Sequence, residues 1–227
     1  MEQEPSEDKT EQTEQLLSER VCAKIAKDTC FLELVRLIIA GLKKDTSSQH
    51  KLHIQTIIWS MKNICLHKSF INKSPLNIQK SLLLIVRQIL FECFNLDTIE
   101  NQFLHPLIQL LIDLLNISHK DDSSDFQTYM IENIDIKFIL EKCLTSEGDD
   151  YKLMKLGVTL FGSLIQYEGN EEKLMKVTMP ETMDYIDHNV FRDTSKMFDD
   201  EVSIESKKEI IEVHKVSLWM LSNFVVN

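Results

Sequence analysis

The sequence predicts an all-α protein of the stacked-helix kind, a right-handed armadillo- or HEAT-like solenoid of about four repeats. Of its 227 residues 43% are hydrophobic, but only five are Gly and four are Pro. So few turn residues argue against a protein of many short strands. Apolar residues recur instead at helical spacing, in long runs that end near residues 67, 117, 168 and 227. These intervals of roughly 50 to 59 residues lie somewhat above the roughly 40 to 47 of armadillo and HEAT units.

The N-terminal part has two predicted segments. Residues 1–12 are polar and charged without an aromatic residue, so we expect a flexible acidic tail. The remaining residues, 13–227, are predicted to form the armadillo-like helical repeat domain. Its first helix, over 13–28, carries an apolar stripe and would cap the first repeat. The stripe consists of Leu16, Leu17, Val21 and Ile25.

The first repeat is predicted as a short helix followed by a longer one. Gly41 stands just past the first apolar set, where a left-handed residue often ends a helix. A polar run then separates the two sets. The first set is Phe31, Leu34, Val35, Ile38 and Ile39, and the second is Ile54, Ile57, Ile58, Met61, Ile64 and Cys65.

Prolines mark the second repeat. Ser74 is a candidate cap and Pro75 a candidate first residue of a helix that is apolar almost all round over 82–93. A helix of that composition is expected to be covered on several sides. Pro106 lies early in the next run, over 104–117.

Two further short-then-long pairs follow. Asp125 is a candidate cap of a short helix, and a second apolar set covers 134–140. In the long run over 153–167, Gly157 and Gly162 would allow neighbouring helices to approach closely. The last pair runs from about Leu174 to a long helix over 205–227. Because no turn signal follows this helix before Asn227, we expect either an apolar C-terminal end that docks on another surface or a truncated array.

Composition narrows the classes of function. The formal charge of −11 argues against a general nucleic-acid binder and favours basic partners. No apolar run is long enough to span a bilayer, and the acidic start is unlike a signal peptide, so we expect a protein of the cytoplasm or nucleus. The five cysteines have no CxxC spacing and are interpreted as buried thiols in a reducing compartment.

Residues 168–212 hold 13 acidic and six basic residues, a pattern typical of a solvated face with an acidic loop.

No pattern indicates a catalytic, metal or cofactor site. His50 and His53 are three residues apart, but no further ligand stands at a completing spacing. No nucleophile has a recognisable base beside it, and no glycine belongs to a phosphate-binding loop. The sequence therefore predicts no cofactor, no metal and no small-molecule substrate.

Both tryptophans open a WxxxN pattern, Trp59 with Asn63 and Trp219 with Asn223. A spacing of four places each pair on one helical face. Such a row could clamp an extended peptide, because the amide can bond the peptide backbone while the indole flanks the stem of Lys or Arg. The four residues are therefore the candidate peptide-binding site.

The helices that hold these pairs resemble importin alpha, the armadillo-repeat receptor of nuclear localisation signals. The segment over 57–68 is similar to the family's TWxLSNLCRGK helix, and that over 218–224 to its CWxISNI helix. Between them, 156–162 is similar to AVGNIVTG. The resemblance covers about residues 30–227 and implies a concave face that holds a basic peptide. It does not extend to the family's basic importin-beta-binding segment or to a tryptophan in 104–117.

The sequence leaves three functions to be compared. The first is a non-catalytic, importin-alpha-like adaptor that binds a basic, nuclear-localisation-type peptide through Trp59, Asn63, Trp219 and Asn223. The second is a structural scaffold subunit of a larger assembly, for instance a cytoskeletal or ciliary one, with the same fold and no free groove. An enzyme is the third.

Overall fold

The computed structural model confirms an all-helical chain: the residues that it describes form helices joined by short non-helical segments, without a strand. The described residues are 20, 21, 24, 30–42, 48–66, 76–93, 99–118, 125–144, 150–166, 174 and 196–226. The predicted tail over 1–12, most of the helix over 13–28, and Ser74 with Pro75 lie outside them. Contacts divide the chain into two compact units, Met1–Phe94 and Asn95–Asn227.

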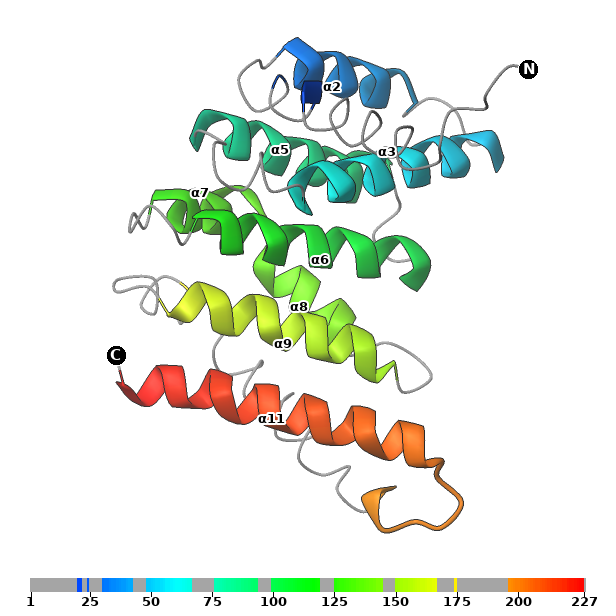
Figure 1. Ribbon diagram of the computed structural model, residues 1–227, viewed down its shortest axis with the longest axis vertical. Coiled ribbons are helices and arrows are strands. Elements are labelled where there is room, and N and C mark those ends of the chain that lie inside the picture. Colours follow the sequence, from blue (N-terminus) through cyan, green and yellow to red (C-terminus); the bar gives the residue numbers. More distant parts are fainter. Residues whose placement is uncertain are drawn as a thin grey trace, which may run out of the picture. The chain divides into compact units, whose positions relative to one another are not determined.

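The first unit contains α2 (Cys30–Leu42), α3 (Ser48–Leu66) and α5 (Leu76–Gln88), which continues into the π-helical turn η1 (Ile89–Cys93). In Figure 1 these are the blue, cyan and blue-green ribbons. α2 packs against α5, η1 and α3. The apolar run over 82–93, which forms the end of α5 and all of η1, is buried at most of its apolar positions, as its composition predicts. The fully covered apolar residues of α5 are Ile78, Leu82, Leu83, Ile85 and Val86.

Two expectations for the first unit are wrong. Gly41 does not follow α2 but lies within its last turn, without a left-handed backbone conformation. Ile39 lies in the same turn and is fully buried, so this end of α2 is packed even though glycine has a low helix propensity. Among the three cysteines described in this unit, Cys30 is exposed and Cys93 is half-buried, so Cys65 alone of these three fits the prediction of buried thiols.

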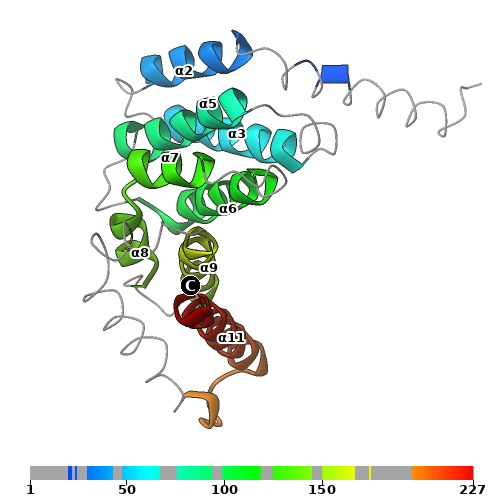
Figure 2. The same ribbon diagram turned by 90° about the vertical axis from the view of Figure 1, so that its left-hand side faces the viewer.

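The second unit contains α6 (Asn101–Ser118), α7 (Asp125–Asn133), α8 (Ile136–Leu144), α9 (Tyr151–Ile165) and α11 (Ile204–Val226). α9 is at its centre and packs against α6, α8 and α11. Figure 1 shows α6, α9 and α11 side by side, and Figure 2 shows α7 and α8 next to this layer. The predicted runs over 104–117, 153–167 and 205–227 correspond to its three long helices.

α6 includes Pro106, which cannot donate a backbone hydrogen bond to the preceding turn. The helix continues nevertheless, because Leu107, Ile108, Leu110 and Leu111 are fully buried just after the proline. At its start, Phe103 and Leu104 both donate backbone hydrogen bonds to the Glu100 carbonyl.

Gly157 and Gly162 set the spacing of the helices around α9. A Cβ atom on Gly157 would lie 2.6 Å from Cys143 Cβ of α8, and one on Gly162 would lie 2.5 Å from Trp219 Cζ3 of α11. Only glycine lets both neighbours come this close. The expectation that these two glycines permit close helix approach is confirmed.

Candidate protein-binding surface

The exposed face of α3 carries apolar side chains that the first unit does not cover. Trp59 is 66% exposed, Leu52 61% and Leu66 51%. The three residues stand seven apart, with exposed Thr56 and Asn63 between them. The resulting steps of four, three, four and three residues follow one face of a helix. We name this face the α3 stripe, formed by Leu52, Thr56, Trp59, Asn63 and Leu66.

The other face of α3 is buried. Ile54, Ile58, Met61 and Cys65 have at most 2% exposure and follow the same steps of four and three residues. They anchor the helix in the first unit, so the α3 stripe is presented on a fixed element. A helix with apolar residues on two faces has more apolar surface than one packing layer needs. The buried face and the Trp59/Asn63 pair could be predicted from the sequence. Leu52 and Leu66 were not predicted as part of the site, although each stands seven residues from Trp59 and therefore on the same helical face.

The α3 stripe belongs to a basic stretch of an acidic sequence. Between residues 46 and 91 the sequence has no Asp or Glu, and it has six Lys and Arg residues. On α3 itself, the positions beside the stripe are His53, Gln55, Ser60 and Lys62. No carboxylate of α3 is therefore available to hold a lysine or arginine against Trp59.

The second predicted pair is used inside the protein. Trp219 is half-buried, and its ring is where a side chain on Gly162 would be. Asn223 is also half-buried, and its Nδ2 donates a 3.3 Å hydrogen bond to the Gly162 carbonyl. Indole and amide thus fasten α11 to one point of α9. The two predicted pairs belong to different units, Trp59 and Asn63 to the first, Trp219 and Asn223 to the second.

A polar cluster fixes the start of α9. Asp150 is the N-cap, and its Oδ1 accepts a 3.0 Å hydrogen bond from the Leu153 backbone N–H. Its Oδ2 lies 2.8 Å from His105 Nε2 and accepts a 2.9 Å hydrogen bond from Asn101 Nδ2, both on α6.

Burial acts to raise the pKa of Asp150, but the hydrogen bonds from Leu153, His105 and Asn101 and the charge of His105 outweigh it, so the pKa lies below its usual value. Every oxygen of this carboxylate is already occupied by α6 and α9, which makes it a structural group.

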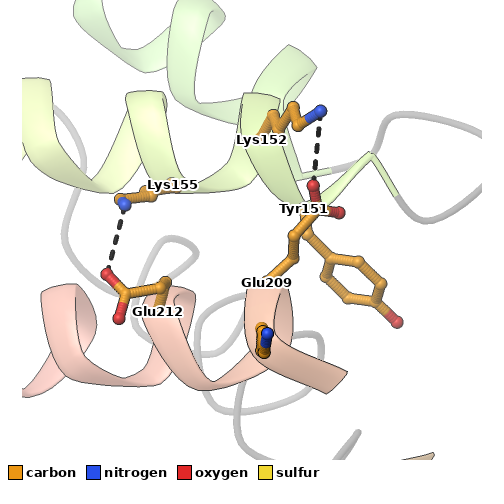
Figure 3. A pocket seen from close by; sticks show the side chains of 6 residues that line it. Tyr151, Lys152, Lys155, Glu209 and Glu212 are labelled. Carbon is orange, nitrogen blue, oxygen red and sulfur yellow. Dashed lines mark hydrogen bonds and ion pairs between the residues drawn. The ribbon is translucent and has the colours of Figure 1, made fainter. Parts of the chain in front are cut away.

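Two ion pairs connect α9 and α11 across a small pocket of about 200 Å³ (Figure 3). Lys152 Nζ lies 3.4 Å from Glu209 Oε1, and Lys155 Nζ lies 3.3 Å from Glu212 Oε2. Hydrogen bonds from Lys215 and Lys155 hold the pKa of Glu212 below its usual value. The pairs are largely exposed and neutralise one another, so they hold two neighbouring helices together and offer little net charge to a ligand.

The other described residues show neither a reactive thiol nor a metal-binding cluster. Burial, reinforced by the charge of Asp150, raises the pKa of the Cys143 thiol far above its ordinary value, which keeps it protonated and unreactive. His50 and His53, which the sequence did not predict to form a metal site, differ in exposure: His50 is buried and His53 is exposed. No group of three or more His, Cys, Asp or Glu residues among those described could hold a metal ion.

Comparison with known proteins gives no match: no family model, no curated protein and no solved structure matches the chain. The importin-alpha resemblance therefore remains a prediction. None of the described helices has the length and apolar character required to cross a membrane.

Proposed function

We propose that this chain is a non-catalytic protein-binding protein whose contact surface is the α3 stripe. The observation that carries the proposal is the exposure of Trp59 between Leu52 and Leu66 on one face of a helix whose opposite face is buried. Tryptophan is among the residues that contribute most at protein interfaces. A row of large exposed apolar side chains is a typical mark of an interaction site.

The proposed architecture is an armadillo-like stack. It is supported in the second unit by the succession of α7, α8 and α9, two short helices and a long one, and by the side-by-side packing of α6, α9 and α11. Such repeats bind other polypeptides along the surface of their long helices. In this reading α3 is the long helix of an earlier repeat.

Between the two protein-binding functions, the contacts favour the scaffold subunit. An importin-alpha-like adaptor would clamp a basic peptide with both Trp/Asn pairs and nearby carboxylates. Here Trp219 and Asn223 are engaged with Gly162, and α3 has no acidic residue. A stable interface in a larger assembly, in contrast, can be centred on the exposed apolar row of the α3 stripe without acidic residues or a second Trp/Asn pair. The adaptor remains the second candidate because Trp59 and Asn63 are both open on one face.

The test is purification of the tagged full-length chain from its own cells, as wild type and as Trp59→Ala. We expect a stoichiometric protein partner with the wild type and its loss with Trp59→Ala. Leu218→Ala, which removes another exposed leucine on α11, is the matched control and should retain the partner. A partner retained by Trp59→Ala would contradict the α3 stripe as the site.

The same proteins distinguish scaffold from adaptor. Titration of a fluorescent Lys/Arg-rich peptide should show no Trp59-dependent binding if the chain is a scaffold subunit. Binding that is abolished by Trp59→Ala, with unchanged helix content by circular dichroism, would instead support the adaptor.

A further inference from the structure

We propose that the α3 stripe binds one amphipathic α-helix of a protein partner, with carboxylates on the positions that flank the partner's apolar seam. This inference rests on the proposed function and names the class of its partner. It commits to a helix and not to an extended segment, and to acidic and not basic flanks.

The spacing of the α3 stripe is that of a helix-packing seam. In a two-helix seam, apolar residues alternate in steps of three and four so that each fits between residues of the facing helix. Leu52, Trp59 and Leu66 occupy every second position of that pattern. They span about 21 Å along the helix axis at 1.5 Å per residue, which corresponds to about four turns of a partner helix. An extended peptide would not match this periodicity.

The two polar members of the stripe suit burial under a helix. The Thr56 hydroxyl donates a 2.9 Å hydrogen bond to the Leu52 carbonyl, so covering it leaves no donor unsatisfied. Asn63 stands at a position where a single polar residue selects register and orientation in helix pairs, at some expense of affinity. One polar and one internally satisfied residue among three large apolar ones is consistent with a specific seam.

Charge decides the partner's flanks. Lys62 lies beside the stripe, and the sequence from 46 to 91 contains no carboxylate to oppose its charge. Acidic flanks on the partner would be attracted there, and basic flanks repelled. A second copy of this chain would place Lys62-bearing seams against each other, so charge also disfavours self-association through this face.

The experiment uses the full-length chain and two fluorescent peptides of three heptads. Both have Leu at the seam positions, and one has Glu and the other Lys at all flanking positions. Like charges on the flanks keep each peptide monomeric, and the two are otherwise matched. Affinity is measured by fluorescence anisotropy and helix formation by circular dichroism.

We expect the Glu-flanked peptide to gain helicity on binding and to bind about three- to fivefold more tightly than the Lys-flanked peptide, since the exposed charge of Lys62 attracts one set of flanks and repels the other. Trp59→Ala should weaken its binding by about 30-fold or more, as for a central interface tryptophan. Leu218→Ala should leave the affinity unchanged, and Lys62→Glu should remove the preference for Glu flanks.

Four results would overturn the inference: binding of neither peptide, tighter binding of the Lys-flanked peptide, binding insensitive to Trp59→Ala, or binding without gain of helix. Sedimentation showing a dimer that Trp59→Ala dissolves would assign the face to a second copy instead.

The chain's own acidic tail is the remaining alternative occupant. It is tested by replacing Glu2, Glu4, Glu7 and Glu11 with Gln; a large rise in peptide affinity would overturn the inference in favour of the tail. In each of these cases a cellular partner that is still lost with Trp59→Ala would leave the proposed function standing.

Discussion

The absence of a Cβ atom at two glycines allows the helices of the second unit to approach one another closely. At Gly157 the nearest obstacle to an added methyl group is Cys143 Cβ, which cannot move without moving the backbone of α8. At Gly41, by contrast, an added Cβ would meet nothing within 4 Å. Both glycines lie in helices, so a comparison of the two Gly→Ala substitutions separates the effect of helix propensity on stability from the effect of packing.

We predict that Gly157→Ala lowers the free energy of unfolding by about 1–3 kcal/mol, because overpacking outweighs the gain in helix propensity. Gly41→Ala should raise it by up to about 1 kcal/mol, since only propensity changes there. Urea unfolding followed by circular dichroism measures both. Equal stabilisation by the two substitutions would show that α8 and α9 are not in close contact at this point.

Residue identity alone did not reveal the different roles of the two tryptophans. Trp59 and Trp219 stand in the same WxxxN pattern, and the pattern places tryptophan and asparagine on one face in either case. It carries no information about what lies opposite that face. Gly162, 57 residues before Trp219, supplies the partner surface in one case, and the α3 stripe is left uncovered in the other.

At the scale of elements, Asp150 links the beginning of α9 to α6. Its carboxylate caps α9 and accepts or shares hydrogen bonds with two residues of α6. Because its folded-state pKa is below the ordinary value, the ionised form stabilises the fold. That contribution is fully present above the ordinary carboxyl pKa of about 3.9 and is lost as the pH falls through the lowered folded-state value.

We expect Asp150→Asn to lower the free energy of unfolding by about 1–3 kcal/mol at neutral pH, because an amide cannot accept from Asn101 and His105 through its nitrogen. The difference from wild type should shrink as the pH falls below about 4.

Asp135→Asn is the matched control for this prediction. Asp135 Oδ1 accepts one 3.0 Å backbone hydrogen bond from Phe138 at the start of α8, and asparagine can replace it as a cap. Urea unfolding at several pH values measures both variants. A pH-independent effect of Asp150→Asn would contradict a stabilising ionised carboxylate.

For the whole molecule, each compact unit contains one tryptophan, and the two are expected to differ in what they contribute. Trp59 is mostly exposed, whereas Trp219 packs against α9 beside the fully buried Met220. Removing an exposed side chain leaves the folded contacts intact, and removing a packed one creates a defect where it was.

Amide hydrogen exchange of the full-length chain measures this contrast segment by segment. We predict that Trp219→Ala accelerates exchange in α9 and α11 and leaves α3 and α5 unchanged, because local stability follows local contacts. Trp59→Ala should change exchange in no helix. Faster exchange in α3 after Trp59→Ala would mean that the indole supports the fold, and the case for an open binding surface would fail.

The helical class, the bounds of α6, α9 and α11 to within a few residues, the burial of the apolar run over 82–93 and the close contacts of Gly157 and Gly162 could all be predicted from the sequence. These features depend on local periodicity and residue size, both of which can be read from residues close together in the sequence. Three features became visible in the folded structure alone: Gly41 stays within α2, Trp219 and Asn223 fasten α11 to α9, and Leu52, Trp59 and Leu66 are exposed. The physical reason is that exposure depends on residues distant in sequence, and a helical pattern shows which side chains share a face but not whether another helix covers it.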